Sequence, residues 1–426
     1  MSLTLGIDIG TGGIRGAVLD DSGAVMTSAR VDHLPNDPDK IDADTWWVGV
    51  QNCIRLLGRN LLEAGLRTQD VARIAVDGTS GSMVLVDDAL RPVTRALMYN
   101  SSGFEAEAAR IAECAPPSHI TRGSNSALAR AMRLVAEDPD GNARHLLHQA
   151  DFVTARLIGR GGFSDHNNTL KTGFDPATET WPEWMAILIE MDLMPDARPV
   201  GEPLDVVAPG VAAELGLSPA TVVHAGTTDS IAAFFACAPQ ETGVAVTSLG
   251  STLAIKVLSP TRVDDPEMGL YSHRINQNWL AGGASNTGGA VLAAHFDKDA
   301  LLSLSARIDP QQESPLEYYP LLTAGERFPV NDPHLQPQLE PRPDDDVAFL
   351  HGMLESMARI EARCYRAVEA AGGPYPQKLF TAGGGAANPT WTAIRSRVLA
   401  IAPKTSQQTE AAVGVARLAL AHAVED

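Results

Sequence analysis

Residues 3–20 (LTLGIDIGTGGIRGAVLD) combine an acidic side chain with a glycine-rich turn. Asp8 lies near the end of an apolar run, where a carboxylate is costly unless a cation or a hydrogen-bond donor meets it. Thr11, Gly12 and Gly13 follow, and glycines allow successive backbone N–H groups to approach an anion closely. A carboxylate for Mg²⁺ beside an amide cradle for phosphate is the outline of a nucleotide site. An ordinary hairpin with a glycine-rich turn is the alternative interpretation.

This stretch matches neither of the two common phosphate-binding signatures. No Gly-Lys-Ser/Thr follows the glycines, as a Walker A loop requires. A second apolar run begins at Ile14, so a strand rather than a dinucleotide-binding helix comes next. Two strand-like runs joined by a short turn predict a β-hairpin.

A second acidic residue stands at another predicted strand end. In residues 221–237 (TVVHAGTTDSIAAFFAC), an apolar strand runs into a Gly-Thr-Thr turn, and Asp229 precedes a helix of small residues. Asp229 can cap this helix. Alternatively, it can act as a general base at the mouth of a cleft, because a carboxylate beside a sugar hydroxyl can accept its proton.

Residues 243–259 (GVAVTSLGSTLAIKVLS) repeat the pattern of the first stretch. The Gly250-Ser251 turn corresponds to the Gly10-Thr11 turn, and apolar runs flank both. Ser248 takes the place of Asp8, so only one copy would supply a metal carboxylate. The repeat suggests an internally duplicated, two-lobed fold with facing phosphate loops, although the match is short and chance is the alternative.

Three more polar turns are candidates for ligand contacts. Residues 77–82 (DGTSGS) offer hydroxyls and amides where a strand ends, which is where open α/β sheets place ligands. Residues 164–175 (SDHNNTLKTGFD) are predicted to be a polar loop that either grips a polyol or forms local side-chain turns. Three glycines at 383–385 follow a predicted strand and allow close backbone approach to a flat ring or a phosphate.

Helical spacing of apolar residues predicts the elements that position these turns. Helices are expected over residues 45–66, 146–157, 347–371 and 410–421. Trp46 and Trp47 on the first of them are expected to pack in a core rather than to bind a ligand.

Composition narrows the class of protein. A chain of 426 residues with 44% hydrophobic and 20% charged residues predicts a soluble protein of two or three domains. A net charge of −19 argues against nucleic acid and anionic membrane surfaces as partners. No apolar run has the length of a membrane helix, and no signal peptide is visible at the N-terminus. The four cysteines are widely spaced, which favours free thiols over a zinc site or disulfides, and a cytoplasmic location.

Taken together, these stretches resemble the FGGY carbohydrate kinases, sugar kinases of the actin-like ATPase class. The resemblance covers nearly the whole chain through eight ordered motifs: GIDIGTGGIRGAV, DGTSGSMVLVD, AGTTDSIAAFFA, GVAVTSLGST, GGASNTGG, GERFP, FTAGGGAANPTW and EAAVGVARLA. DGTSGS and SDHNNTLKTGFD make it most similar to the short pentulose-kinase branch, which is xylulokinase-like in name and has D-ribulokinase as its assigned activity.

The resemblance implies an α/β protein made of duplicated RNase H-like domains, with MgATP between two lobes and sugar deep in the cleft. Residues 1–240 would form the lobe with the sugar site, the first phosphate loop and the catalytic base, and residues 241–426 the nucleotide-binding lobe. The implied activity is transfer of the ATP γ-phosphoryl group to a terminal hydroxyl of a ketopentose, with D-ribulose as the expected substrate. The enzyme would work as a monomer or homodimer.

The resemblance implies functional roles for residues at positions that match the family's motifs. Asp8 resembles the carboxylate that organises Mg²⁺, through water, and Asp229 resembles the general base. The two phosphate loops correspond to Thr11, Gly12 and Gly13, and to Gly250, Ser251 and Thr252. The pocket for the nucleotide base corresponds to Gly384, Gly385, Asn388 and Trp391. The sugar contacts correspond to Ser80, Asp8 and Asp229.

The chain departs from larger xylulokinases and glycerol kinases at two sugar-binding motifs. Thr79-Ser80-Gly81 stands where they carry a Gln-His-Gly or Arg-Glu motif, and Tyr99-Asn100-Ser101 replaces a Trp-x-Asp-x-Arg segment. Both differences lie in the sugar pocket, so they leave phosphoryl transfer unaffected but argue against D-xylulose and glycerol as substrates. D-xylulose or another polyol is the alternative to D-ribulose. A protein of another class, an actin-like nucleotide-dependent binding protein with weak or no kinase activity, is the further alternative.

Overall fold

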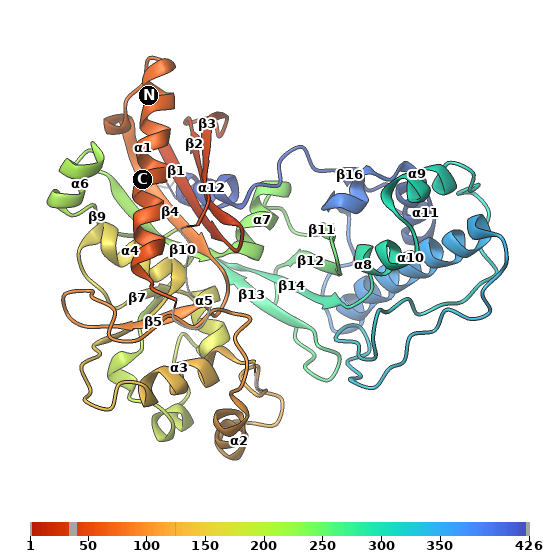
Figure 1. Ribbon diagram of the computed structural model, residues 1–426, viewed down its shortest axis with the longest axis horizontal. Coiled ribbons are helices and arrows are strands. Elements are labelled where there is room, and N and C mark those ends of the chain that lie inside the picture. Colours follow the sequence, from red (N-terminus) through yellow and green to blue (C-terminus); the bar gives the residue numbers. More distant parts are fainter. Residues whose placement is uncertain (1, 34–40, 124, 423–426) are drawn as a thin grey trace. The chain divides into compact units, whose positions relative to one another are not determined.

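The structure is a computed structural model that describes residues 2–33, 41–123 and 125–422 (Figure 1). It divides into two compact units. The first unit comprises Met1–Ala236 and Gln408–Asp426, and the second comprises Cys237–Gln407. Within the described ranges, no helix combines the length and the apolar character needed to cross a membrane.

The first unit is built on a six-stranded sheet. Its strand order is β3 (Val25–Val31), β2 (Gly13–Leu19), β1 (Leu3–Gly10), β4 (Val71–Gly78), β10 (Val222–Thr228) and β9 (Pro203–Val206). Strands β1, β4 and β10 are parallel, and the other three run antiparallel to their neighbours. Strand β1 is buried along almost its whole length, which explains its near-continuous apolar sequence.

Helices cover both faces of this sheet. Helices α1 (Asp44–Glu63) and α4 (Gln149–Ile158) pack on one face, and the last helix, α12 (Ala411–Ala421), packs on β1, β4 and β2. The alternation along β2 separates the two cores, because Val18 belongs to the core that contains α1, whereas Ala17 and Leu19 join α12. Helix α7 (Asp229–Cys237) lies directly beside α12.

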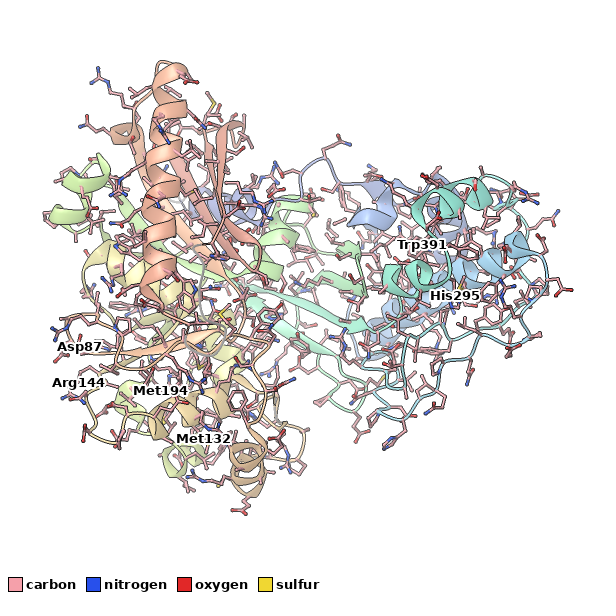
Figure 2. The ribbon with its side chains drawn as sticks, viewed as in Figure 1. Asp87, Met132, Arg144, Met194, His295 and Trp391 are labelled. Carbon is pink, nitrogen blue, oxygen red and sulfur yellow. The ribbon has the colours of Figure 1, made fainter. Side chains whose placement is uncertain are left out.

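The chain between β4 and β10 adds a smaller layer with its own core. Strand β5 (Met83–Val86) pairs with β6 (His145–His148), and β7 (Phe163–Asp165) pairs with β8 (Asp196–Arg198). Met132 and Met194, labelled in Figure 2, belong to this part of the chain. Its helices are α2 (Glu105–Cys114), α3 (Ala127–Ala136) and α5 (His166–Thr172). Helix α6 (Pro209–Leu215) instead packs beside α1 and joins the main core.

The second unit repeats the architecture of the first. Its sheet has the order β13 (Tyr271–Ile275), β14 (Asn278–Ser285), β12 (Leu253–Ser259), β11 (Val244–Leu249), β15 (Lys378–Ala382) and β16 (Lys404–Thr405). Hairpin β11–β12 beside the parallel β15 corresponds to hairpin β1–β2 beside the parallel β4. The predicted duplicated α/β fold is therefore confirmed. Its helices are α8 (Gly289–His295), α9 (Lys298–Ser305), α10 (Asp346–Ala370) and α11 (Pro389–Leu399).

Local predictions fail in two places. The helix expected over residues 146–157 begins only at Gln149, because the residues before it form β6 and pair with the distant β5. Residues 164–175, expected to be a polar loop, instead form the end of β7 and helix α5, and most of their side chains are buried. The polar residues there bond to one another and to the backbone, which is how buried polar groups are tolerated.

The chain is also divided differently from the expected lobes 1–240 and 241–426. The last helix belongs to the first unit, because a glycine of β1 lets the strand approach this helix closely and a glycine of the helix lets it approach α7 closely. A Cβ atom on Gly6 would lie 1.9 Å from the carbonyl oxygen of Ala412, and one on Gly414 would lie 1.7 Å from that of Ala232. No sequence period indicates such long-range packing.

Candidate active site

Three acidic residues stand at the carboxyl ends of the parallel strands in the first unit. Asp8 on β1 lies opposite Asp77 on β4, and Thr227 on β10 lies opposite Asp77 from the other side. Asp229 follows directly at the start of α7. Because parallel strands end at the same edge of a sheet, this edge gathers the two predicted catalytic carboxylates around Asp77.

The Asp8 carboxyl group contacts Arg15 and the carboxyl group of Asp77. The carboxylate is 4% exposed, and its Oδ2 atom accepts a hydrogen bond of 3.1 Å from Nη1 of Arg15. Its Oδ1 atom has no hydrogen-bond partner among the described residues. Burial raises the pKa of Asp8 above its usual value. A cation bound at Oδ1 would satisfy that oxygen and stabilise the ionised form.

The surroundings of Asp8 fit a magnesium ion that is bound mainly through water and phosphate. Mg²⁺ in nucleotide sites takes one or two protein carboxylates and keeps several waters. Asp8, with its unpartnered buried oxygen, is the residue that would hold such an ion. No cluster of three or more acidic, histidine or cysteine side chains suited to a metal occurs within the described part of the chain.

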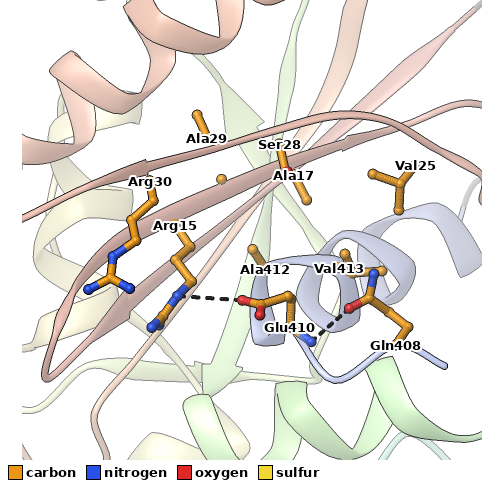
Figure 3. A pocket seen from close by; sticks show the side chains of 11 residues that line it. Arg15, Ala17, Val25, Ser28, Ala29, Arg30, Gln408, Glu410, Ala412 and Val413 are labelled. Atoms are coloured by element: carbon orange, nitrogen blue, oxygen red, sulfur yellow. Dashed lines mark hydrogen bonds and ion pairs between the residues drawn. The ribbon is translucent and has the colours of Figure 1, made fainter. Parts of the chain in front are cut away.

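Arg15 connects Asp8 to the last helix. Its Nε atom lies 3.4 Å from Oε2 of Glu410, which stands just before α12 (Figure 3). The two side chains line a pocket of about 430 Å³ bounded by β2, β3 and the start of α12. The orientation of the Asp8 carboxylate therefore depends on a residue that lies about four hundred positions away in sequence.

Asp77 was not singled out by sequence reasoning, although the structure puts it between the two predicted catalytic carboxylates. Its side chain is fully buried. Burial raises the pKa of Asp77 well above its usual range, and the charges of Asp8 and Asp229 raise it further. A carboxyl at the end of an apolar strand is the same signal that led to Asp8, so the sequence does contain the pattern that identifies it.

Asp229 is partly exposed and bonds to the start of its helix. Its Oδ1 atom accepts a hydrogen bond of 2.6 Å from the backbone N–H of Ser230. Asp229 is the first residue of α7, and a bond from the adjacent N–H is not the capping bond, which comes from two or three residues further on, so the capping role stays a prediction. Partial exposure of the carboxylate also leaves it accessible, as a general base must be.

The β1–β2 turn has the shape of a tight backbone cradle. Thr11 and Gly12 are exposed, and Gly13 has φ +134°, with a Cβ position 2.6 Å from the carbonyl oxygen of Val31. Only glycine fits there. Arg30 donates a hydrogen bond of 3.0 Å to the carbonyl oxygen of Gly12, which fixes the turn.

In the second unit, the predicted nucleotide residues gather at the ends of two adjacent strands. Ser251 and Thr252 are exposed in the β11–β12 turn, and the backbone N–H of Gly289 donates to the carbonyl oxygen of Gly250. Strand β15 runs parallel to β11 and ends beside this turn. A Cβ on Gly383 would lie 2.5 Å from the carbonyl oxygen of Leu249, so the glycine turn and the phosphate turn touch.

Two of the predicted base-pocket residues have structural contacts of their own. Asn388 caps α11 through a hydrogen bond from the Trp391 backbone N–H (3.0 Å) and also donates to Ser305. Trp391 is 2% exposed and belongs to the core of the second unit (Figure 2). A Cβ on Gly385 would lie 2.6 Å from its ring. A Cβ on Gly384 would meet nothing within 4 Å, so the open part of this turn is at Gly384.

The predicted site residues therefore form two groups, each assembled within one unit. The first unit carries Asp8, Thr11, Gly12, Gly13, Ser80 and Asp229. The second unit carries Gly250, Ser251, Thr252, Gly384, Gly385, Asn388 and Trp391. The roles carried over to them remain predictions.

The fold and these motifs define a carbohydrate kinase. A model described as the FGGY family of carbohydrate kinases, N-terminal domain, matches residues 3–236, and the C-terminal domain model matches residues 245–423. The chain belongs to the FGGY family of carbohydrate kinases.

Known proteins similar to this chain are sugar and polyol kinases. The xylulose kinase of Escherichia coli strain K12 is 23% identical over 445 residues, covering 97% of this chain and 89% of the relative. A crystal structure of xylulose kinase from Rhodospirillum rubrum has a TM-score of 0.87 at 22% identity, covering 100% of this chain and 90% of that one. Plasmodium falciparum glycerol kinase with ADP has a TM-score of 0.85 at 14% identity, covering 100% and 90%.

Proposed function

We propose that this carbohydrate kinase transfers the γ-phosphoryl group of ATP to a terminal hydroxyl of a ketopentose. The observation that carries the proposal is the edge of the first sheet, where Asp8 and Asp229 stand at the ends of parallel strands on either side of Asp77. The similarity to kinases named for xylulose supports a ketopentose as the acceptor. The similarity to a glycerol kinase solved with ADP supports ATP as the phosphoryl donor.

Phosphoryl transfer needs little covalent chemistry from the protein, so positioning and charge neutralisation dominate. Asp229 accepts the proton of the sugar hydroxyl as it attacks, a role worth about 10²–10⁴-fold in rate. The backbone amides of the 11–13 and 250–252 turns surround the phosphates. Mg²⁺ held by Asp8 would neutralise phosphate charge when bound.

The sugar is proposed to be D-ribulose or D-xylulose. The DGTSGS turn and residues 164–175 favour D-ribulose through the pentulose-kinase resemblance. The relatives named xylulose kinase support D-xylulose at least as strongly. Coupled ADP release with D-ribulose, D-xylulose, L-ribulose, ribitol and glycerol, each with MgATP, ranks them by kcat/KM. A higher kcat/KM for ribitol or glycerol than for both ketopentoses would contradict the proposal.

The base assignment predicts the behaviour of Asp229→Ala and Asp229→Asn. Both variants should lose about 10²–10⁴-fold in kcat, because neither can take up the proton. Affinity for MgATP, measured by calorimetric titration, should change little. Asp299→Asn, on the exposed first turn of α9, is the matched control and should keep wild-type kcat. Near wild-type kcat in Asp229→Ala would show that another group takes the proton.

A further inference from the structure

The β4–β5 turn, residues 79–82, is tied to α4 through a chain of hydrogen bonds. The Oε1 atom of Gln149 accepts from the Thr79 backbone N–H at 2.9 Å and from the Thr79 hydroxyl at 2.7 Å. The hydroxyls of Thr79 and Ser82 lie 2.6 Å apart, and the Tyr99 backbone N–H donates to Oγ of Ser82 at 2.9 Å.

The direction of this chain follows from its ends. Thr79 has one hydroxyl hydrogen, and the amide oxygen of Gln149 can only accept, so that hydrogen is used there. The Ser82 hydroxyl must therefore donate to Thr79. One unbroken path runs from the Tyr99 N–H through Ser82 and Thr79 to Gln149, and a change at either end loosens all of it.

Arg130 holds the other side of the same turn. From α3, its Nε atom donates to the carbonyl oxygen of Gly81 at 2.8 Å, and Nη1 donates to those of Tyr99 and Asn125, both at 3.1 Å. Its planar guanidinium group thus joins three separate segments. A Cβ on Gly81 would lie 2.6 Å from Nη2 of Arg130, so the arginine packs closely against this glycine.

The charge of Arg130 is unusual for so buried a residue. The side chain is 3% exposed, and no carboxylate within the described ranges forms an ion pair with it. Burial lowers the pKa of Arg130 to about 10. Burying an unpaired cation on neutral carbonyls is costly, so this arrangement indicates that the geometry of the turn matters.

Ser80 is the member of the turn that these contacts leave unused. Thr79, Gly81 and Ser82 all carry the bonds described above, whereas the half-buried Ser80 hydroxyl has no hydrogen-bond partner within the part of the chain that the structure describes. The clamp made by Gln149 and Arg130 therefore fixes the backbone on both sides of one free hydroxyl. That hydroxyl lies two residues beyond the end of β4, which carries Asp77.

We propose that Gln149 and Arg130 are positioning residues that aim the Ser80 hydroxyl at a hydroxyl of the sugar, and so set sugar affinity and the choice between ketopentoses. The inference rests on the proposed ketopentose kinase function. The clamp also joins residues 79–81 to residues 99–101, the two segments in which this chain departs from larger sugar kinases. The two departures thus form one structural unit.

A double-mutant cycle between Ser80 and Arg130 tests the inference. Ser80→Ala removes one sugar hydrogen bond and should raise KM for the preferred ketopentose about 3- to 10-fold. Arg130→Lys keeps the charge but cannot reach three carbonyls at once, and should raise the same KM by a similar factor. The double variant should have the same KM for the ketopentose as Ser80→Ala alone, because Arg130 has no effect on sugar binding once the Ser80 hydroxyl is absent. KM for ATP, and kcat at saturating sugar, should stay within about 3-fold in each variant.

A second pair of variants tests the Gln149 side without touching the arginine. Thr79→Val keeps the shape of the side chain but breaks the hydroxyl chain, and should raise KM for sugar and alter the ratio of kcat/KM for D-ribulose over D-xylulose. Thr79→Ser retains the hydroxyl and should restore both values. Arg133→Lys, one turn further along α3 and bonded to Glu107 instead, is the control and should match wild type.

The kinetic results distinguish failure of the clamp from failure of the kinase function. Additive effects of Ser80→Ala and Arg130→Lys on KM, or equal losses for sugar and ATP, would overturn the clamp while leaving the kinase function intact. A failure of Arg130→Lys to fold, seen by thermal unfolding, leaves the Thr79 pair to decide, and Thr79→Val with wild-type sugar kinetics would overturn the inference. A wild-type protein inactive on every ketopentose would overturn the proposed function and this inference with it.

Discussion

Asp165 shows how a buried carboxyl can make stability depend on pH. It caps α5 by accepting hydrogen bonds from the backbone N–H groups of Asn167 and Asn168 at 2.8 and 3.1 Å, and from the Asn168 side chain at 2.6 Å. Burial raises the pKa of Asp165 to about 7, and the nearby charge of Asp151 adds to the effect. His148, whose Nδ1 atom lies 2.6 Å from Asp151, belongs to the same buried group.

The pKa of Asp165 predicts a loss of stability as pH rises from about 4 to about 7. The folded state binds a proton in this window that the unfolded state has released, so folding is favoured below it and less favoured above it. Each unit of pKa difference is worth about 1.4 kcal/mol. Asp165→Asn cannot ionise, so its free energy of unfolding in urea should improve relative to wild type between pH 5 and pH 8. A constant difference across this range would contradict the prediction.

At the scale of residues, the sequence indicates the side chains that stand at strand ends but not those that act through the backbone. Asp8 and Asp229 are recognisable because a carboxylate ends an apolar run. Arg130 is invisible by the same reasoning, since its partners are carbonyl oxygens from three separate segments and carry no residue-type signal. Asp77 carries the same signal as Asp8 and could have been found.

At the scale of elements, hydrophobic periodicity and turn residues predict the helices and strands that depend mainly on nearby residues. Hairpin β1–β2 and helices α1, α10 and α12 follow the expected ranges closely, because period and turn chemistry agree there. Strand β6 and helix α5 were missed because β6 depends on pairing with the distant β5, and α5 depends on a polar network that its own sequence does not reveal. The packing of α12 on β1 is a further long-range effect.

The contact between β1 and α12 predicts a strong effect of Gly6→Ala. The added Cβ would lie 1.9 Å from the Ala412 carbonyl oxygen, so helix or strand must shift. Overpacking of this kind costs about 1–3 kcal/mol or more. Gly210→Ala on α6 is the matched control, because nothing lies within 4 Å of its Cβ position and alanine favours helices by about 0.5–1 kcal/mol. In urea, Gly6→Ala should lower the free energy of unfolding and Gly210→Ala should raise it. Equal free energies of unfolding for the two variants would refute the tight contact.

At the scale of the whole molecule, the first unit is discontinuous. The chain leaves it after Ala236 and returns at Gln408, so the sheet is covered by a helix that lies far from its strands in sequence. Two small cores of the first unit include residues of this helix packed against β2, β4 and α7. Glu410 also meets Arg15, which holds Asp8. Both the stability of the sheet and the setting of the candidate metal carboxylate therefore depend on the last helix.

This discontinuity predicts that a chain ending at Gln407 fails to fold its first unit. Val413, Val415 and Leu418 are almost fully buried, and each such side chain contributes about 1.5–3 kcal/mol. Together they approach the whole stability of a typical domain, about 5–15 kcal/mol. A chain ending at His422 keeps α12 and should unfold at the wild-type temperature. In calorimetry, the shorter chain should lose the transition of the first unit, because an uncovered face of β1 and β4 leaves its apolar side chains in water. Retention of wild-type unfolding by that chain would show that the sheet does not need this helix.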